Sequence, residues 1–283
     1  MTATLRLLTA ADGAALEAFL ARHAAFTMLL RANLRASGLQ PGSGPYHGVY
    51  AARLAGDRIT DVAAHYWNGN IILFAPTAAA DLAEFLAGHT AQEVAGVLGP
   101  WRHCLAALEA LGLRERAIDP HEEDLFELPL ARLVLPPRLS YRRATARDRD
   151  TLVRWRIDYA VETLGLTPDA KLAADAEDTI ARLIAAGHLW VATDDAGAPL
   201  AMSAFNAVLP DMVQVGGVHT PKPWRGRGYA RMAVAGALAE ARAGGATTAI
   251  LFTEVRNAPA QAVYTALGFR RIGDYGLILL RTA

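Results

Sequence analysis

The sequence predicts an α+β fold built from two similar domains, and three observations support this prediction. The chain has 283 residues, which is too long for one small domain and suits two domains that each bury a core. Segments with the period of strands alternate with segments with the period of helices. The two halves also begin and end alike, which indicates two tandem copies of one domain.

The internal repeat is visible at both ends of each half. RLLTAADGAAL, which starts at Arg6, aligns with RRATARDRDTL, which starts at Arg142. Near the ends of the halves, ALGLRER from Ala110 resembles ALGFRRI from Ala266. The second offset is larger, so the second copy holds about 20 additional residues. The alternative is chance matching in a chain rich in Ala, Leu and Arg.

A proline pair marks the predicted junction between the copies. Pro136 and Pro137, in LARLVLPPRLS, interrupt helix and remove two backbone donors, as is typical of a linker. We therefore predict two domains, residues 1–135 and residues 139–283.

Composition excludes several classes of function. The 28 basic and 28 acidic side chains give a net charge of zero, so we expect no nucleic-acid partner, and any anion site must be local. The single cysteine, Cys104, cannot form an internal disulfide, which fits a reducing compartment. The N-terminus lacks a signal-peptide pattern, and no apolar run reaches the roughly 18 residues of a membrane span. We expect a soluble, cytoplasmic protein without membrane association.

We predict no metal site. The eight histidines are scattered, and no two stand at the spacing of ligands on one helix or strand. The run from His121 to Asp124 contains three acids, but consecutive acids after Pro120 are more typical of a solvated loop.

The second half has the clearer secondary-structure pattern. LSYRRAT predicts a strand, and two helical segments follow that end at Gly165 and Gly187. HLWVATDDAGAPLAMSAFNAV contains two apolar runs around a turn at residues 195–199, which predicts a hairpin. MVQVGGVHT predicts another strand, and the pair Gly216 and Gly217 within it indicates a bulge or a close backbone approach.

The next segment, WRGRGYARMAVAGALAEARAGG, predicts a helix with one apolar face that stops at Gly244 and Gly245. A helix N-terminus has unpaired N–H groups and a partial positive charge, and glycines before it let phosphate oxygens approach those donors. No acid occurs between Asp211 and Glu240, whereas several cations do. The sequence therefore predicts a phosphate site here. These cations are Lys222, Arg225, Arg227 and Arg231.

The motif around this site distinguishes between kinds of phosphate ligand. GRGYAR is not GxGxxG, and no acid follows at the position that binds a ribose, so a Rossmann dinucleotide site fits poorly. The motif R-x-x-G-x-A (Arg225, Gly228, Ala230) resembles the pyrophosphate loop of the GNAT superfamily of acyl-CoA-dependent N-acyltransferases. AILFTEVRNAPAQAVYTALGFRRIG resembles the family's next strand and its Asn-led helix with a Tyr and a Leu-Gly-Phe ending. The resemblance covers about residues 139–283.

This resemblance implies two GNAT-like domains, each with a mixed, mostly antiparallel sheet flanked by helices. It also implies that acetyl-CoA is the cosubstrate and lies with its pyrophosphate on the loop. A free N–H of the strand before the loop would stabilise the oxyanion during direct attack by a primary amine. The resemblance implies these cofactor-binding residues: Val218, His219, Thr220, Arg225, Gly226, Arg227, Gly228, Tyr229, Ala230, Asn257 and Tyr264.

Two residues of the last helix have alternative interpretations. The resemblance implies that Tyr264 is the acid that protonates the departing thiolate, and the alternative is an amphipathic tyrosine at the core edge. Asn257 stands two helical turns earlier, and it can cap the helix, contact the cofactor, or do both.

The general base stays open at this point. Glu254 lies at the end of the preceding strand and is one candidate for a catalytic role, His219 is a second, and a water relay is the third. Glu162 and Tyr159 are candidates for contacts with the acceptor, which we expect to be an amine of a small molecule or a peptide.

The first half lacks the corresponding residues. Leu108 aligns with Tyr264, Trp101 aligns with Asn257, and no Arg-Gly loop follows the strand NIILFAP. We therefore predict a degenerate copy, in which Tyr66, Trp67 and Trp101 either line an acceptor cleft or belong to the core.

The main function that the sequence predicts is thus an acetyl-CoA-dependent N-acetyltransferase, as a monomer or a homodimer. A non-catalytic acyl-CoA-binding or regulatory module is the alternative, and a nucleotide oxidoreductase is disfavoured by the missing ribose-binding acid.

Overall fold

The computed structural model describes residues 3–40 and 42–281. The chain divides into two compact units. The first comprises the described residues of 1–124 and of 273–283, and the second comprises residues 125–272. Each unit is an α+β structure of strands and flanking helices, as the sequence predicts.

Among the described strands of the first unit, β4 and β5 pair in parallel and the other neighbours pair antiparallel. The strands follow the order β1-β2-β3-β4-β5-β12. Its strands are β1 (Ala3–Leu7), β2 (Gly48–Ala55), β3 (Arg58–Tyr66), β4 (Asn70–Phe74), β5 (Gly96–Gly99) and most of β12 (Arg270–Leu279). Its α-helices are α1 (Gly13–Arg22), α2 (Ala24–Ser37), α3 (Ala79–His89) and α4 (Trp101–Ala110).

In the second unit, β10 and β11 also pair in parallel, whereas β7, β8, β9 and β10 pair antiparallel in turn. The strands follow the order β6-β11-β10-β9-β8-β7. Its strands are β7 (Tyr141–Arg143), β8 (Leu189–Thr193), β9 (Pro199–Val208), β10 (Met212–His219), β11 (Thr248–Glu254) and most of β6 (Glu123–Pro129). Its α-helices are α5 (Arg149–Leu164), α6 (Ala170–Ala186), α7 (Tyr229–Ala243) and α8 (Ala258–Leu267).

The units differ from the predicted division into residues 1–135 and 139–283, because each unit contains the last strand of the other copy. Residues 276–279 of β12 pair with residues 96–99 of β5 in the first unit, although β12 ends the second copy in sequence. Conversely, β6 ends the first copy, and its residues from 125 onward belong to the second unit. A sequence repeat aligns the copies but does not show which sheet a strand joins.

The repeat at the start of each copy has the same structure in both units. In the second unit, Arg142 donates two hydrogen bonds to Asp148, at 2.7 and 2.8 Å. The same carboxylate accepts from the backbone N–H of Thr145 at 2.8 Å. Arg6 and Asp12 pair in the same way in the first unit. The aligned Arg, Thr and Asp residues thus form an equivalent capping structure before the first helix of each copy.

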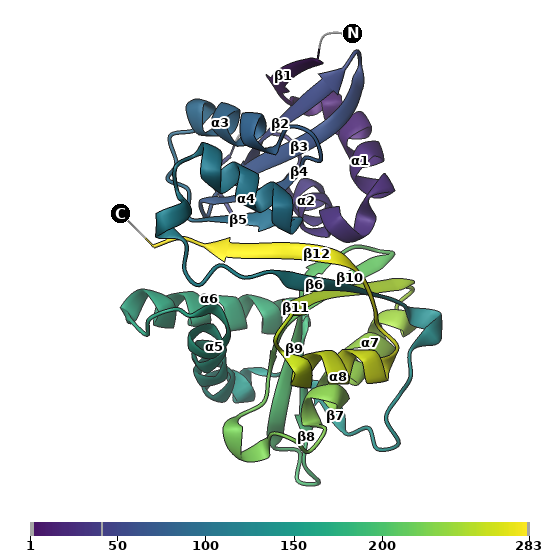
Figure 1. Cartoon of the computed structure of the whole chain (residues 1–283). Coiled ribbons are helices and arrows are strands. Elements are labelled where there is room, and N and C mark those ends of the chain that lie inside the picture. The colour runs from purple at the N-terminus through teal and green to yellow at the C-terminus, as the bar shows by residue number, and fades with distance from the viewer. Residues whose placement is uncertain (1–2, 41, 282–283) are drawn as a thin grey trace. The chain divides into compact units, whose positions relative to one another are not determined.

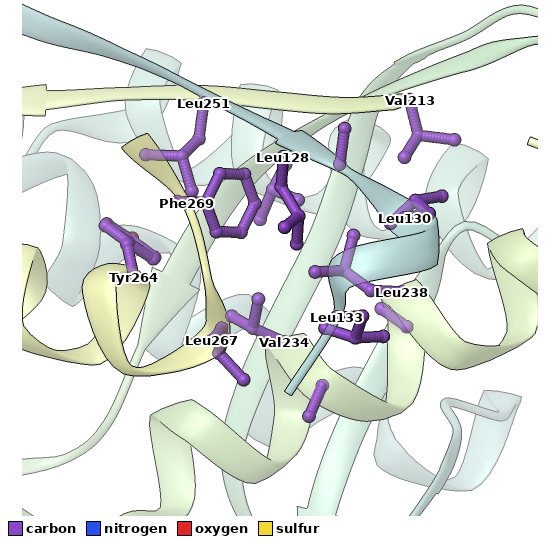
Figure 2. Packing of buried hydrophobic residues seen from close by; sticks show 14 of the residues in the cluster. Leu128, Leu130, Leu133, Val213, Val234, Leu238, Leu251, Tyr264, Leu267 and Phe269 are labelled. Atoms are coloured by element: carbon purple, nitrogen blue, oxygen red, sulfur yellow. The ribbon is translucent and has the colours of Figure 1, made fainter. Parts of the chain in front are cut away.

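The second unit has a separate core on each face of its sheet. Figure 1 shows α5 and α6 on one side of the strands and α7 and α8 on the other. The core below α7 and α8 contains Val213 and Val215 of β10, together with Val234 and Leu267 from the helices. Figure 2 shows this cluster. The core on the α5 side contains Trp155 and other apolar residues of α5, α6, β8 and β9.

Most predicted elements of the second half are confirmed, and the acidic run of the first half is not. α5 and α6 end at Gly165 and Gly187, which both have left-handed backbones. The expectation of a solvated loop at His121–Asp124 is wrong for its last two residues. Glu123 and Asp124 lie in β6, and both are buried because the strand is covered.

Neither a cluster of metal ligands nor a membrane-spanning helix is found among the residues that the structure describes. Within residues 3–40 and 42–281, no group of three or more His, Cys, Asp or Glu is arranged to hold a metal ion. No helix in the same part of the chain is both long enough and apolar enough to cross a membrane.

Candidate active site

The loop before α7 leaves a row of backbone donors unpaired. The first hydrogen bond of α7 runs from the N–H of Met232 to the carbonyl of Gly228, at 3.1 Å. Among the described residues, none accepts a hydrogen bond from the backbone N–H groups of Gly226–Arg231. These donors, together with the helix dipole, favour an anion at this end of α7.

Two exposed glycines keep this end of the helix open. Gly226 and Gly228 have φ angles of +75° and +81°, which L side chains rarely adopt. A Cβ atom built on either residue meets no protein atom within 4 Å. The space beside the N–H groups is therefore free, and a pyrophosphate fits the chemistry of this loop.

The side chain of Arg225 fastens the loop instead of extending from it. Its Nε donates to the carbonyl of Thr220 at 2.8 Å, and its Nη2 donates to Glu162 at the end of α5. Lys222 Nζ lies 3.2 Å from the other carboxylate oxygen of Glu162. The hydrogen bond from Arg225 is the main reason that the pKa of Glu162 is lowered. Glu162 was a candidate acceptor contact, and in this structure its carboxylate is paired with the loop.

The other predicted residues of the loop have distinct environments. Arg227 is exposed, and no described residue forms an ion pair or hydrogen bond with its side chain. Arg231 donates from Nη2 to the carbonyl of Ala266 at 3.3 Å and so connects α7 to α8. Tyr229 packs against a small apolar cluster, and Ala230 follows it in the first turn of α7. Arg227 is therefore the loop cation best placed to meet a phosphate.

Strands β10 and β11 stop pairing before their C-terminal ends. They pair in parallel only over Met212–Gln214 and Thr248–Ile250. Strand β10 continues for five residues to His219, and β11 continues to Glu254. The two strands therefore separate beyond Gln214, which leaves the edge of β10 without its neighbour over the segment that contains Val218.

The predicted bulge in β10 is also present. Gly216 pairs with Ala204 of β9, and His219 pairs with Met202. The chain therefore advances three residues along β10 where it advances two along β9, so β10 contains one extra residue. Gly217 has a φ angle of +58°, which suits glycine. The extra residue shifts the alternation of side chains, so Val218 packs against the core under α7 and α8.

His219 therefore faces α5. Its ring centroid lies 6.4 Å from that of Trp155, and only 6% of the residue is exposed. Its Nε2 atom is buried and has no hydrogen-bond partner among the described residues. Burial is the main cause that lowers the pKa of His219, so the imidazole is neutral at pH 7. The hydroxyl of Thr220 is likewise buried without a described partner.

The two predicted residues of α8 have observable structural roles. Asn257 caps the helix, since its Oδ1 accepts from the N–H of Ala260 at 3.2 Å. Tyr264 is 7% exposed, and its ring lies 6.0 Å from Phe269 and 6.5 Å from Phe126. Figure 2 shows it at one side of the core cluster, beside Phe269. Capping and packing are compatible with the roles that the sequence predicts.

Glu254, one of the three candidates for the base, lies at the end of β11, and its carboxylate is paired with a neighbouring side chain. Arg256 Nε donates to Glu254 Oε1 at 2.8 Å, and the glutamate side chain is 30% exposed. Tyr159, the other candidate for an acceptor contact, lies beneath the guanidinium of Arg156 at 5.2 Å.

In the first unit, the helix equivalent to α7 has a side chain of the same unit bound at its N-terminus. Helix α3 follows β4 as α7 follows β10, and the buried carboxylate of Asp61 lies at its start. Asp61 accepts from the N–H groups of Thr77 and Ala78 at 2.7 and 3.0 Å. Ala78 and Ala79 are also buried, in contrast to the exposed glycines before α7. The aromatic Tyr66 is core, and its hydroxyl donates to another buried tyrosine.

Comparisons with known proteins agree with this geometry. Residues 138–270 match the model of the acetyltransferase (GNAT) domain. No curated protein sequence matches the chain. A Drosophila protein of known structure aligns with a TM-score of 0.69 at 15% identity, over 98% of this chain and 98% of that one.

Two further structures carry descriptions of the same family. A GCN5-related N-acetyltransferase from Sphaerobacter thermophilus has a TM-score of 0.58 at 16% identity, over 98% of this chain and 94% of that one. A tandem GNAT protein from the clavulanic acid biosynthesis pathway has a TM-score of 0.56 at 14% identity, over 98% and 97% of the two chains. At these identities the likeness shows a common fold, which is the tandem GNAT fold.

Proposed function

Because residues 138–270 are a GNAT acetyltransferase domain, we propose that this chain is an acetyl-CoA-dependent N-acetyltransferase whose second unit carries the chemistry. The observation that supports this most directly is the row of unpaired N–H groups of Gly226–Arg231 beside two open glycines. A pyrophosphate is the ligand that such a helix start binds best.

We assign the binding of acetyl-CoA to the loop and to the free edge of β10. The N–H groups of Gly226–Arg231 and the side chain of Arg227 would hold the pyrophosphate. The main chain of Val218, His219 and Thr220 would contact the pantetheine arm, beyond the point where β11 leaves β10. Asn257 and Tyr264 would approach the cofactor from α8.

Acetyl-CoA, when bound, supplies the acetyl group as a reactive thioester. A backbone N–H of β10 beyond Gln214 would stabilise negative charge on the carbonyl oxygen, since that edge lacks its neighbouring strand. Tyr264 would donate a proton to the departing thiolate. The acceptor is an amine of a small molecule or a peptide, and Glu254 is one candidate for its base.

We propose that the first unit binds no acetyl-CoA. Asp61 places a carboxylate on the N–H groups of Thr77 and Ala78, where a phosphate would otherwise interact. No glycine stands at this helix start, and the alanines there are buried. The first unit then serves as a structural copy, and binding should occur once per chain.

Calorimetric titration of the full chain with acetyl-CoA, followed by a panel of amines assayed by CoA-thiol release, tests this proposal. We expect one acetyl-CoA per chain and thiol release with at least one class of amine. Tight binding without release for polyamines, amino acids, aminoglycosides and peptide N-termini would favour the alternative, a non-catalytic acyl-CoA-binding module. Binding of NADH in place of acetyl-CoA would overturn both.

A further inference from the structure

We propose that His219 is the general base that accepts the proton of the acceptor amine. This inference rests on the proposed acetyl transfer and adds to it the residue that performs its first proton transfer. The sequence left Glu254, His219 and a water relay as alternatives. The structure separates them by the direction, burial and bonding of the side chains.

The bulge in β10 determines where His219 points. Val213 and Val215 lie in the core under α7 and α8, and regular alternation would place residue 219 on that same face. Because the bulge adds one residue, Val218 takes that face and His219 pairs with Met202, which belongs to the core on the α5 side. Bulges commonly redirect a side chain beside an active site.

This direction places the proposed acid and the proposed base on opposite faces of the sheet. Tyr264 lies in the core cluster under α7 and α8. His219 lies toward α5, at the end of the strand whose free edge we assign to the pantetheine arm. An amine that approaches from the α5 side and a thiolate protonated from the α8 side would each meet one of these groups.

The Nε2 atom of His219 is a buried polar atom without a hydrogen-bond partner among the described residues. Buried side-chain nitrogens nearly always have a hydrogen-bond partner, because an unsatisfied polar atom costs about 1–3 kcal/mol. His219 is 94% buried by its 6% exposure, and no described residue bonds its Nε2. A substrate N–H would satisfy this acceptor.

The charged neighbours of His219 leave its imidazole neutral and free to accept a proton. From α5, Glu162 and Asp158 raise its pKa, whereas Arg225 of the loop lowers it, and burial exceeds each of these effects. Glu162 is itself paired with Arg225 and Lys222, so its carboxylate does not compete for the amine proton. On α5, Trp155 packs against the ring of His219, and Arg156 Nη1 lies 3.9 Å from the Cβ position of Gly217 in the same strand.

Glu254 fits the role of base less well. Its carboxylate accepts from Arg256 Nε at 2.8 Å, so a base at this position must first give up an ion pair. His219 has no such partner to lose.

The proton balance assigns each group one task. His219 Nε2 takes one proton from the ammonium form of the acceptor, and the neutral amine then forms the C–N bond as the C–S bond breaks. Tyr264 protonates the sulfur. The second proton, which the nitrogen loses as the amide forms, returns to the tyrosine, and His219 releases its proton to solvent.

The test compares His219→Gln with His188→Gln in the full chain. Glutamine keeps a hydrogen-bonding side chain and does not titrate. His188 is a matched control, since burial also lowers its pKa and it lies in the same unit just before β8. We expect His219→Gln to lower kcat by about 10²-fold to 10³-fold and to remove the acidic limb of the profile of kcat/KM against pH. The control should keep that limb.

Calorimetry and proton NMR distinguish a lost base from a disturbed fold. The Kd for acetyl-CoA, measured by calorimetry, should change less than about 3-fold in His219→Gln, because its side chain serves the amine. Proton NMR of the unsubstituted chain should show one histidine, absent from the spectrum of the His219 variant, that titrates at the pKa of the kinetic limb. An unchanged acidic limb, or a loss of acetyl-CoA binding in the variant, would overturn the role of His219. Absence of acetyl-CoA binding by the unsubstituted chain would instead reject the proposed function.

Discussion

Replacement of Gly228 by leucine should abolish the binding of acetyl-CoA while leaving the protein folded. Gly228 has a φ angle of +81° and precedes the first residue of α7. A side chain there would project into the space that we assign to the pyrophosphate, since no protein atom lies within 4 Å of its Cβ position.

The effect on stability and the effect on binding have different magnitudes. A left-handed backbone costs a non-glycine residue about 1–2 kcal/mol, and no steric overlap with protein atoms adds to this. Hydrogen bonds to a charged group contribute about 1.5–3 kcal/mol each. Loss of two of them raises the Kd by about 10²-fold to 10⁴-fold, at 1.4 kcal/mol for each factor of ten.

Gly197 provides a matched control for the strain. It lies in the same unit, between β8 and β9, with a φ angle of +83° and no protein atom within 4 Å of its Cβ position. Urea unfolding should show similar losses of stability for Gly197→Leu and Gly228→Leu. Calorimetry should show normal acetyl-CoA binding for Gly197→Leu only. Equal affinity in both variants would refute the assignment of the loop to the pyrophosphate.

Tyr264→Phe should lower turnover by about 10²-fold at all pH values with little change in acetyl-CoA affinity, and unchanged turnover would assign the hydroxyl to packing alone. The hydrogen bond from Arg142 lowers the pKa of Asp148 to about 2, so its carboxylate stabilises the fold above about pH 4 and loses this effect as the pH falls toward 2. Asp148→Asn should therefore lower the free energy of unfolding by about 2 kcal/mol at pH 7, and urea titrations should show this difference shrinking below pH 4. Asp61→Ala should lower the free energy of unfolding by about 2–4 kcal/mol, because it removes the acceptor of Thr77 and Ala78 N–H, whereas acetyl-CoA should still bind with unchanged affinity.

The parts of the site that the sequence predicts are those that depend on neighbouring residues. The glycines before α7 and Gly217 in the bulge of β10 are local features, because they have backbone angles that only glycine adopts readily. The cap at Asn257 is local because its acceptor and donor are three residues apart. Short-range rules therefore predict these features.

The parts that the sequence does not predict depend on distant contacts. Arg225 and Glu162 are 63 residues apart, and nothing in either segment indicates that the arginine pairs with a carboxylate of α5. The membership of β12 in the first unit depends on pairing with β5, and a strand with a suitable apolar pattern can pair with either copy. The unpaired Nε2 of His219 depends on burial, which a single sequence does not contain.

The two copies differ at the N-terminus of the helix that follows their fourth strand, because only the first copy places a carboxylate there. Both begin with the same Arg, Thr and Asp structure, and both have a helix after the fourth strand of their fold. In the first unit, Asp61 supplies the anion at the start of that helix, from within the chain and fully buried. In the second unit, Gly226 and Gly228 leave the equivalent donors open to solvent. A carboxylate of the same chain at a helix N-terminus stabilises the helix but occupies the N–H groups that would bind a phosphate. A helix N-terminus can bind a phosphate only if these N–H groups are unpaired.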